Sequence, residues 1–438
     1  MNAELIDLSP LLLLAGIGLL LAGGPLLWLL RRHRHASTPQ RLRALTLLAL
    51  FLTFDLIVFG AYTRLSDSGL GCPDWPGCYG SVSPVGAHGE IQAAQTAMPT
   101  GPVTHGKAWV EMIHRYLATG VGMLLLVLCV WTWVWVTVRG RTGDPSTPQE
   151  RSAVSPGWAT LSLFWVCLQG AFGALTVTMK LNPGIVTLHL LGGVGLLALL
   201  AVQAQRCTAL LTDGRTGTSD AGGAGTHSDM THNDMTRSAG PGERLWPSRV
   251  ALPAGLRRAT LAVLLLVIMQ VALGGWVSTH YAVLACTEFP TCQGSWWPPM
   301  DFSHAFEWRP ALGVNADGQH LSLATLTAIH MTHRLAAFVV LGAMLALAVA
   351  LRRHGLPAAR PYGAWLIGLA LWQLASGLSN VVLGWPLIAA LAHTAGAAAL
   401  VAVLAALLAA SAELLARPVR EPSPEPVGRA PAVTAESA

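Results

Sequence analysis

Residues 184–205 read GIVTLHLLGGVGLLALLAVQAQ, an apolar stretch that contains His189 but no Asp, Glu, Lys or Arg. As a helix rising about 1.5 Å per residue, it would be roughly 33 Å long, enough to cross the hydrocarbon core of a bilayer. The apolar residues are continuous rather than alternating, which is not the pattern of an outer-membrane barrel strand. The stretch therefore predicts a transmembrane helix.

Eight more runs of this kind occur along the chain, at 10–30, 43–63, 109–138, 157–178, 257–278, 322–351, 362–384 and 387–416. The whole chain of 438 residues is 53% hydrophobic and only 11% charged. A soluble domain carries roughly a quarter charged residues, so the composition excludes an ordinary soluble enzyme. We expect an all-α, polytopic transmembrane protein embedded in the lipid bilayer.

The basic residues gather at one set of loops. Loops 31–42, 139–156, 206–256 and 352–361 and the tail from Arg417 hold most of the 27 Lys and Arg residues. The alternate loops, 64–108, 179–183, 279–321 and 385–386, hold only Arg64, Lys107, Lys180 and Arg309. The positive-inside rule places the first set in the cytoplasm and the second outside an inner (plasma) membrane. These short clusters form no basic domain, so we expect no nucleic-acid partner.

The chain repeats itself. Gly60-Ala61-Tyr62, followed by Cys72 and Cys78, is matched by Gly274-Gly275-Trp276, followed by Cys286 and Cys292. Further along, His114-Arg115 is matched by His333-Arg334, and His189 by His393. Each repeat contains four apolar runs, an even number, so both repeats enter the membrane in the same direction. We therefore expect two parallel four-helix bundles plus one extra N-terminal helix.

The repeat suggests five segments. They are an extra helix and cytoplasmic linker (1–42), a first four-helix unit (43–205), a flexible cytoplasmic linker (206–256), a second unit (257–416) and a disordered tail (417–438). The linker is rich in Gly, Ser, Thr and Asp, a composition typical of flexible chain. His227 and His232 lie in it, but no neighbouring residues complete a metal site, so we interpret them as solvated.

Four histidines lie at repeated positions near the outward ends of the apolar runs: His114, His189, His333 and His393. Histidines inside a membrane are costly and usually functional. Two at matching depth on two helices of one bundle can ligate a heme iron from both sides. Hydrogen bonding to a neighbouring helix and a nonheme metal cluster are the alternatives, but few carboxylates are available to complete a cluster.

Charged residues stand beside these histidines. Glu111 precedes His114 by one helical turn, whereas the second unit has His330 at the matching position. Glu111 either acts as a general acid or base, or simply pairs with Arg115 or Lys107. Arg115 and Arg334 either bind heme propionates or extend to the lipid headgroups.

The cysteines divide into two groups. Cys72, Cys78, Cys286 and Cys292 lie in outward loops, where an oxidising compartment favours the disulfides Cys72–Cys78 and Cys286–Cys292. A metal or redox role is weaker for these pairs, because neither short loop contains a histidine. Cys129, Cys167 and Cys207 lie at inner or mid-membrane positions and are interpreted as packing residues.

Taken together, these motifs resemble the heme A synthase family over roughly residues 43–410. The resemblance rests on Gly60-Ala61-Tyr62-Thr63-Arg64-Leu65-Ser66-Asp67-Ser68-Gly69-Leu70, on Cys72-Pro73-Asp74-Trp75-Pro76-Gly77-Cys78 and on Glu111-x-x-His114-Arg115. It continues through His189, Cys286-Thr287-Glu288-Phe289-Pro290-Thr291-Cys292, His333-Arg334 and His393. The N-terminal helix and the long linker depart from the family pattern.

The resemblance implies an oxidoreductase that converts a methyl group of heme O to the formyl group of heme A, by successive hydroxylations, for cytochrome oxidase. His114 and His189 would then hold the substrate heme, His333 and His393 would ligate a resident heme b, and Glu111 would be the catalytic acid. Heme O synthase and cytochrome oxidase assembly factors would be partners. A diheme electron-transfer protein and a heme transporter or chaperone are the alternatives. Electron transfer does not require Glu111, and transport gains no support from ligands confined to one side.

Overall fold

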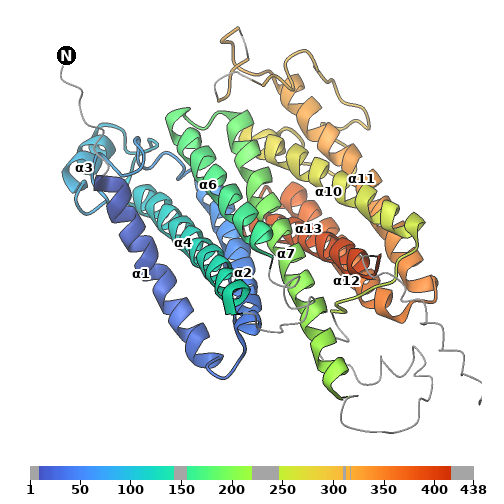
Figure 1. The fold of residues 1–438 in the computed structure, drawn as a ribbon. Helices are drawn as coiled ribbons and strands as arrows, with labels where there is room; N and C mark the ends of the chain where they lie inside the picture. The colour runs from blue at the N-terminus through green and yellow to red at the C-terminus, as the bar shows by residue number, and fades with distance from the viewer. Residues whose placement is uncertain (1–8, 143–154, 220–245, 309–311, 316, 416–438) are drawn as a thin grey trace, which may run out of the picture.

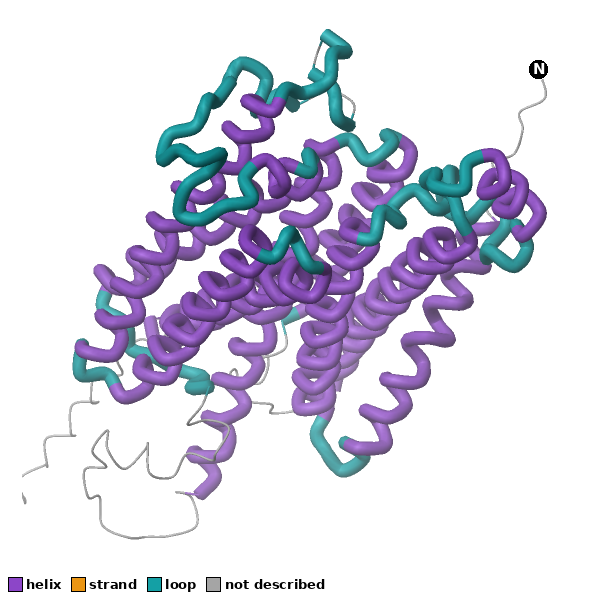
Figure 2. Tube along the Cα trace, turned by 180° about the vertical axis from the view of Figure 1, so that it is seen from behind, coloured by secondary structure: helices purple, strands orange, loops and turns teal. Residues whose placement is uncertain are grey.

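The computed structural model describes residues 9–142, 155–219, 246–308, 312–315 and 317–415. In this part of the chain the regular elements are helices, joined by loops with isolated β-bridges (Figure 2). Nine of the described helices are long and apolar enough to cross a membrane. They are α1 (Ser9–Arg32), α2 (Thr38–Leu65), α4 (His105–Thr142), α6 (Pro156–Thr178), α7 (Pro183–Ser219), α10 (Ala254–Thr279), α11 (Leu323–Arg353), α12 (Arg360–Val382) and α13 (Leu387–Leu415). The prediction of an all-α, nine-span membrane protein is confirmed.

Shorter elements occupy the connections: the helix α3 (His88–Ala97) and the 3-10 turns η1 (Ala282–Ala285) and η2 (Pro357–Ala359). Several long helices begin at residues that favour the start of a helix. Pro156 and Pro183 are the first residues of α6 and α7, a position where the missing N–H costs nothing. At the start of α11, the Ser322 hydroxyl accepts the Thr325 N–H at 3.1 Å.

The long helices pack as two rings of four. Helices α2, α4, α6 and α7 contact one another in sequence around the first ring, and α10, α11, α12 and α13 do so around the second. The rings meet through α2 and α7 on one side and α10 and α13 on the other (Figure 1). Helix α1 lies outside the first ring against α4, where Gly18 faces Thr119 closely.

Both ends of the predicted 206–256 linker are structured. Helix α7 continues past Gln205 to Ser219, beyond the predicted end of the span. At the other end, Trp246 donates its indole N–H to Gln205 Oε1 at 2.9 Å, and Val250 is 1% exposed. Residues 220–245, which include His227 and His232, lie outside the described residues, as do those of the predicted tail from 417 on.

A polar contact joins the two rings at the end that carries the cysteine loops. Arg64 on α2 donates to the Tyr281 hydroxyl at 3.1 Å and to the Ser278 carbonyl at 2.7 Å, and its guanidinium lies 4.4 Å from the Tyr281 ring centroid. The Tyr281 hydroxyl in turn donates to Asp67. Burial, followed by this hydrogen bond, raises the pKa of Tyr281, so the phenol stays protonated and remains a donor.

We expect Tyr281→Phe to weaken this contact, because it removes the hydroxyl but keeps the ring beneath Arg64. A net hydrogen bond is worth about 1 kcal/mol, so the thermal midpoint of the purified protein should fall by about 2 °C. Tyr62→Phe is the matched control, since the Tyr62 hydroxyl makes no hydrogen bond within the described part of the chain. Equal midpoints for the two variants would contradict the assigned role.

Candidate functional site

The four histidines that the sequence predicts as heme ligands lie on diagonally opposite helices of the two rings. His114 is on α4 and His189 is on α7, which do not neighbour each other around the first ring. His333 on α11 and His393 on α13 have the same relation in the second. Each is roughly 9–15 Å from the first residue of its helix, at the end that carries the cysteine loops. Diagonal placement puts the two histidines of a pair on opposite sides of one four-helix ring.

A glycine on the neighbouring helix faces each histidine ring. We measured the distance from a Cβ atom built on each glycine to Cε1 of the imidazole that it faces. This distance is 3.0 Å for Gly60 and His114 and 3.5 Å for Gly173 and His189. It is 3.1 Å for Gly274 and His333 and also for Gly377 and His393. Three of these distances are tighter than ordinary contact between carbon atoms. The glycines therefore form notches into which the imidazoles fit. Sequence reasoning singled out Gly60 and Gly274 as repeat markers but gave none of the four this role.

The facing imidazoles suit a heme bound between them. His114 and His189 lie on opposite helices of the first four-helix ring, within a few helical turns of the end that carries the cysteine loops, and His333 and His393 do so in the second. In the described structure Nε2 makes no hydrogen bond in His114, His189 or His393, which leaves it available to a metal. Among the described residues, no three His, Cys, Asp or Glu side chains gather as metal ligands. Two facing imidazoles are the protein ligands that a six-coordinate heme requires.

The two histidine pairs differ in the polar groups that contact their imidazoles. In the second four-helix ring, Gln270 Nε2 lies 3.0 Å from Nδ1 and 3.4 Å from Nε2 of His333, and the Ser376 hydroxyl lies 3.0 Å from Nδ1 of His393. In the first ring, Nδ1 of His114 and Nδ1 of His189 are buried without a hydrogen-bond partner among the described residues. Sequence reasoning missed Gln270 and Ser376, although both are polar residues inside apolar runs.

The two cysteine loops are built alike. Disulfides join Cys72 to Cys78 and Cys286 to Cys292, as the sequence predicts. A β-bridge pairs Cys78 with Ser81 and another pairs Cys292 with Ser295. The intervening turns contain Gly80 and Gly294, both with φ of 72°, a left-handed conformation that favours glycine.

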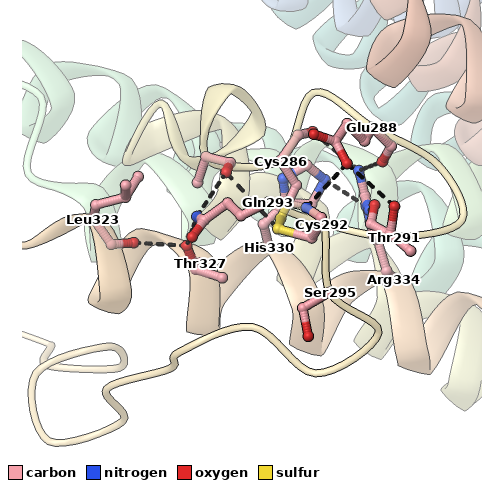
Figure 3. The surroundings of a disulfide bond; sticks show 12 residues. Cys286, Glu288, Thr291, Cys292, Gln293, Ser295, Leu323, Thr327, His330 and Arg334 are labelled. Carbon is pink, nitrogen blue, oxygen red and sulfur yellow. Dashed lines mark hydrogen bonds between the residues drawn. A yellow bond between two sulfur atoms is a disulfide. The ribbon is translucent and has the colours of Figure 1, made fainter.

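Arg115 directly follows His114 on α4, and Arg334 directly follows His333 on α11. Each of these arginines hydrogen-bonds to one of the two cysteine loops. Arg115 donates to the carbonyls of Asp74, Pro76 and Gly77, the last at 2.5 Å. Figure 3 shows Arg334 reaching the second loop, where it donates to the carbonyls of Cys286, Glu288 and Thr291. Both guanidinium groups thus face backbone carbonyls of the loops, and the propionate role expected for them stays a prediction.

Glu111 links its cysteine loop to the helix that carries His114. One carboxylate oxygen accepts the Cys72 N–H at 2.8 Å, and the other accepts from Arg115 at 2.5 Å. Lys107 instead donates to the Gly101 carbonyl at 3.0 Å. Glu111 is 4% exposed, so a buried carboxylate stands one turn from a candidate heme ligand. At the matching position in the second ring, His330 Nε2 accepts from Arg334 at 3.2 Å.

The three remaining cysteines take no part in the two disulfides. Cys129 and Cys207 are buried, which agrees with the expected packing role, whereas Cys167 is exposed on the described surface.

Comparisons with known proteins identify the family of this chain. Residues 43–405 match the COX15-CtaA family, described as cytochrome oxidase assembly protein. A heme A synthase of Shewanella oneidensis is 36% identical, over 82% of this chain and 93% of its own length. A heme A synthase of Methylobacterium sp. (strain 4-46) is 28% identical over 83% and 90%. Because the family match covers most of the chain, with both histidine pairs and both cysteine loops inside it, the chain belongs to the COX15-CtaA family of cytochrome oxidase assembly proteins.

Proposed function

We propose that this chain is a heme A synthase, an oxidoreductase that converts a methyl group of heme O to the formyl group of heme A by successive hydroxylations. The observation that carries the proposal is an asymmetry: two histidine pairs have similar geometry, but only one has a buried carboxylate beside it. Electron transfer between two hemes would not need that difference. The names of the relatives support the same activity.

We assign the substrate heme O to His114 and His189 and a resident heme b to His333 and His393. Glu111 stands beside the first pair only, so chemistry that needs a proton donor or acceptor belongs there. When bound, the heme groups supply the redox chemistry of iron, while the protein supplies ligation, orientation and a pocket that excludes water.

Glu111 is the catalytic acid in this proposal. Its contacts with the Cys72 N–H and Arg115 hold the carboxylate at a set position relative to the His114 helix turn. From there it holds or moves a proton while the substrate methyl group is oxidised. Arg115 also grips the disulfide loop, so the loop, the acid and the ligand helix are connected.

We further propose that the two rings are parallel repeats in the inner (plasma) membrane, with the cysteine loops and histidines toward the periplasmic side. The distribution of Lys and Arg among the loops supports this orientation. Both cysteine loops lie at one end of the bundle (Figure 1), as parallel repeats require. Heme O synthase would supply the substrate, and cytochrome oxidase assembly factors would receive the product.

Glu111→Gln tests the enzymatic proposal. In cells that also make heme O, chromatography of extracted hemes should show heme A with the wild-type protein. Glu111→Gln keeps the size of the side chain but removes the ionisable proton, so the ratio of heme A to heme O should fall by about 100-fold or more. Glu90→Gln, an exposed acid on α3, serves as the control and should match wild type. A wild-type ratio in Glu111→Gln would favour electron transfer.

The ligand assignment predicts that His333→Ala and His393→Ala each lose most of the heme b that copurifies with the wild-type protein. Removing one axial imidazole leaves the iron with a single protein ligand, which weakens binding and changes the low-spin absorption spectrum. His354→Ala changes an exposed histidine at the far end of α11 and should leave the spectrum intact. Full occupancy with an unchanged spectrum in His333→Ala would refute the assignment.

The orientation can be measured by labelling intact cells with a membrane-impermeant maleimide. Gln92→Cys places a thiol on exposed α3 at the cysteine-loop end, and His354→Cys places one at the opposite end. We expect Gln92→Cys to react in intact cells and His354→Cys to react only after the membrane is permeabilised. The reverse result would invert the proposed topology.

A further inference from the structure

Ser376 fixes the protonation pattern of the His393 ring. Its hydroxyl donates to the Trp372 carbonyl at 2.7 Å, the shorter of its two backbone contacts, and lies 3.0 Å from Nδ1 of His393. Because the hydroxyl proton is already donated, the oxygen can only accept from Nδ1–H. A neutral imidazole with its proton on Nδ1 presents the lone pair of Nε2, which is the form that ligates a metal.

Gln270 holds the His333 ring from the neighbouring helix. Its Nε2 donates to the His333 carbonyl at 3.0 Å and lies 3.0 Å from Nδ1 and 3.4 Å from Nε2 of the same residue. Its Oε1 has no hydrogen-bond partner among the described residues. A half-turn of the amide would place Oε1 against the His333 carbonyl oxygen, so the carbonyl contact keeps the N–H group toward the imidazole, where it fixes the position of the ring relative to α10.

The first ring lacks both contacts. Counting from the facing glycines, Leu56 stands four residues before Gly60, as Gln270 stands before Gly274. In the same way Phe172 immediately precedes Gly173, as Ser376 precedes Gly377. Neither a leucine nor a phenylalanine side chain can accept a proton from an imidazole, which agrees with the unpartnered Nδ1 atoms of the first pair.

We propose that Ser376 and Gln270 are positioning residues that make the second histidine pair a permanent heme site, whereas Phe172 and Leu56 leave the first pair able to release its heme. A hydrogen bond to a ligating imidazole fixes its orientation, and where the partner accepts Nδ1–H, as Ser376 does, it also strengthens the imidazole as a donor; loss of such a bond typically weakens metal binding 10- to 100-fold. An enzyme whose substrate and product are both hemes needs one site that retains heme and one that exchanges it. The inference rests on the proposed function, because that assigns the resident heme to His333 and His393.

Transfer of heme to excess apomyoglobin tests this inference. The absorbance of holomyoglobin reports the rate at which heme b leaves the purified protein. Ser376→Ala and Gln270→Leu should each lose heme b about 10-fold faster than wild type or more. In Ser376→Ala the midpoint potential of the remaining heme should also rise, because His393 becomes a weaker donor to the iron.

Ser379→Ala is the matched control, because Ser379 lies on the same helix and its hydroxyl bonds the Ala375 carbonyl at 2.8 Å without contacting a ring. It should lose heme at the wild-type rate, and Ser376→Thr, which keeps the hydroxyl, should restore slow loss. Wild-type rates and potentials in both Ser376→Ala and Gln270→Leu would overturn the inference. Equally fast loss from Ser379→Ala would overturn it too, since that would show general loosening of α12.

Introducing the second pair's polar residues into the first pair gives an independent measurement if Ser376→Ala does not fold. Leu56→Gln combined with Phe172→Ser should slow the loss of added heme O from the first pair, and unchanged loss would count against the inference. The outcome also separates this inference from the proposed function. Retention of heme b by His333→Ala refutes the assignment of the sites, whereas heme loss in His333→Ala with normal retention in both Ser376→Ala and Gln270→Leu refutes only the role of the positioning residues.

Discussion

The site depends on the close approach of a glycine to each membrane histidine. Any larger residue at Gly60, Gly274 or Gly377 would place its Cβ atom about 3 Å from the imidazole, because the helices already lie in contact there. The glycine notches seat each imidazole against the neighbouring helix. Ligand geometry is therefore set by helix packing, not by flexible side-chain reach.

The arginine after each of two histidines extends this constraint to the loops. Arg115 and Arg334 sit one residue beyond a proposed ligand and bond several carbonyls of a disulfide loop. A shift of either helix would therefore break hydrogen bonds to its cysteine loop, and a movement of that loop would displace the neighbouring histidine. In the first ring this connection includes Glu111, which ties the proposed catalytic acid to the backbone of Cys72.

Much of this arrangement could be predicted from the sequence. Continuous apolar runs gave all nine spans, since length and composition alone decide which helices can cross a bilayer. Self-comparison found the histidines and cysteines, because ligands and disulfides impose fixed residue types. The reach of α7 to Ser219 was missed because helices can continue past the apolar boundary. The contacts of Ser376 and Gln270 with the two imidazoles were also missed, because a hydrogen bond to an imidazole depends on packing that only the fold reveals.

The central claim is that facing histidines, seated by glycines, hold heme between diagonal helices. The most direct test is an electron cryomicroscopy map of the full-length protein purified with its heme from cells. The account predicts porphyrin density inside the second ring, with the iron between His333 and His393 and with Ser376 and Gln270 behind the two imidazoles. A map with the porphyrin elsewhere, and both of these histidines unligated, would contradict it.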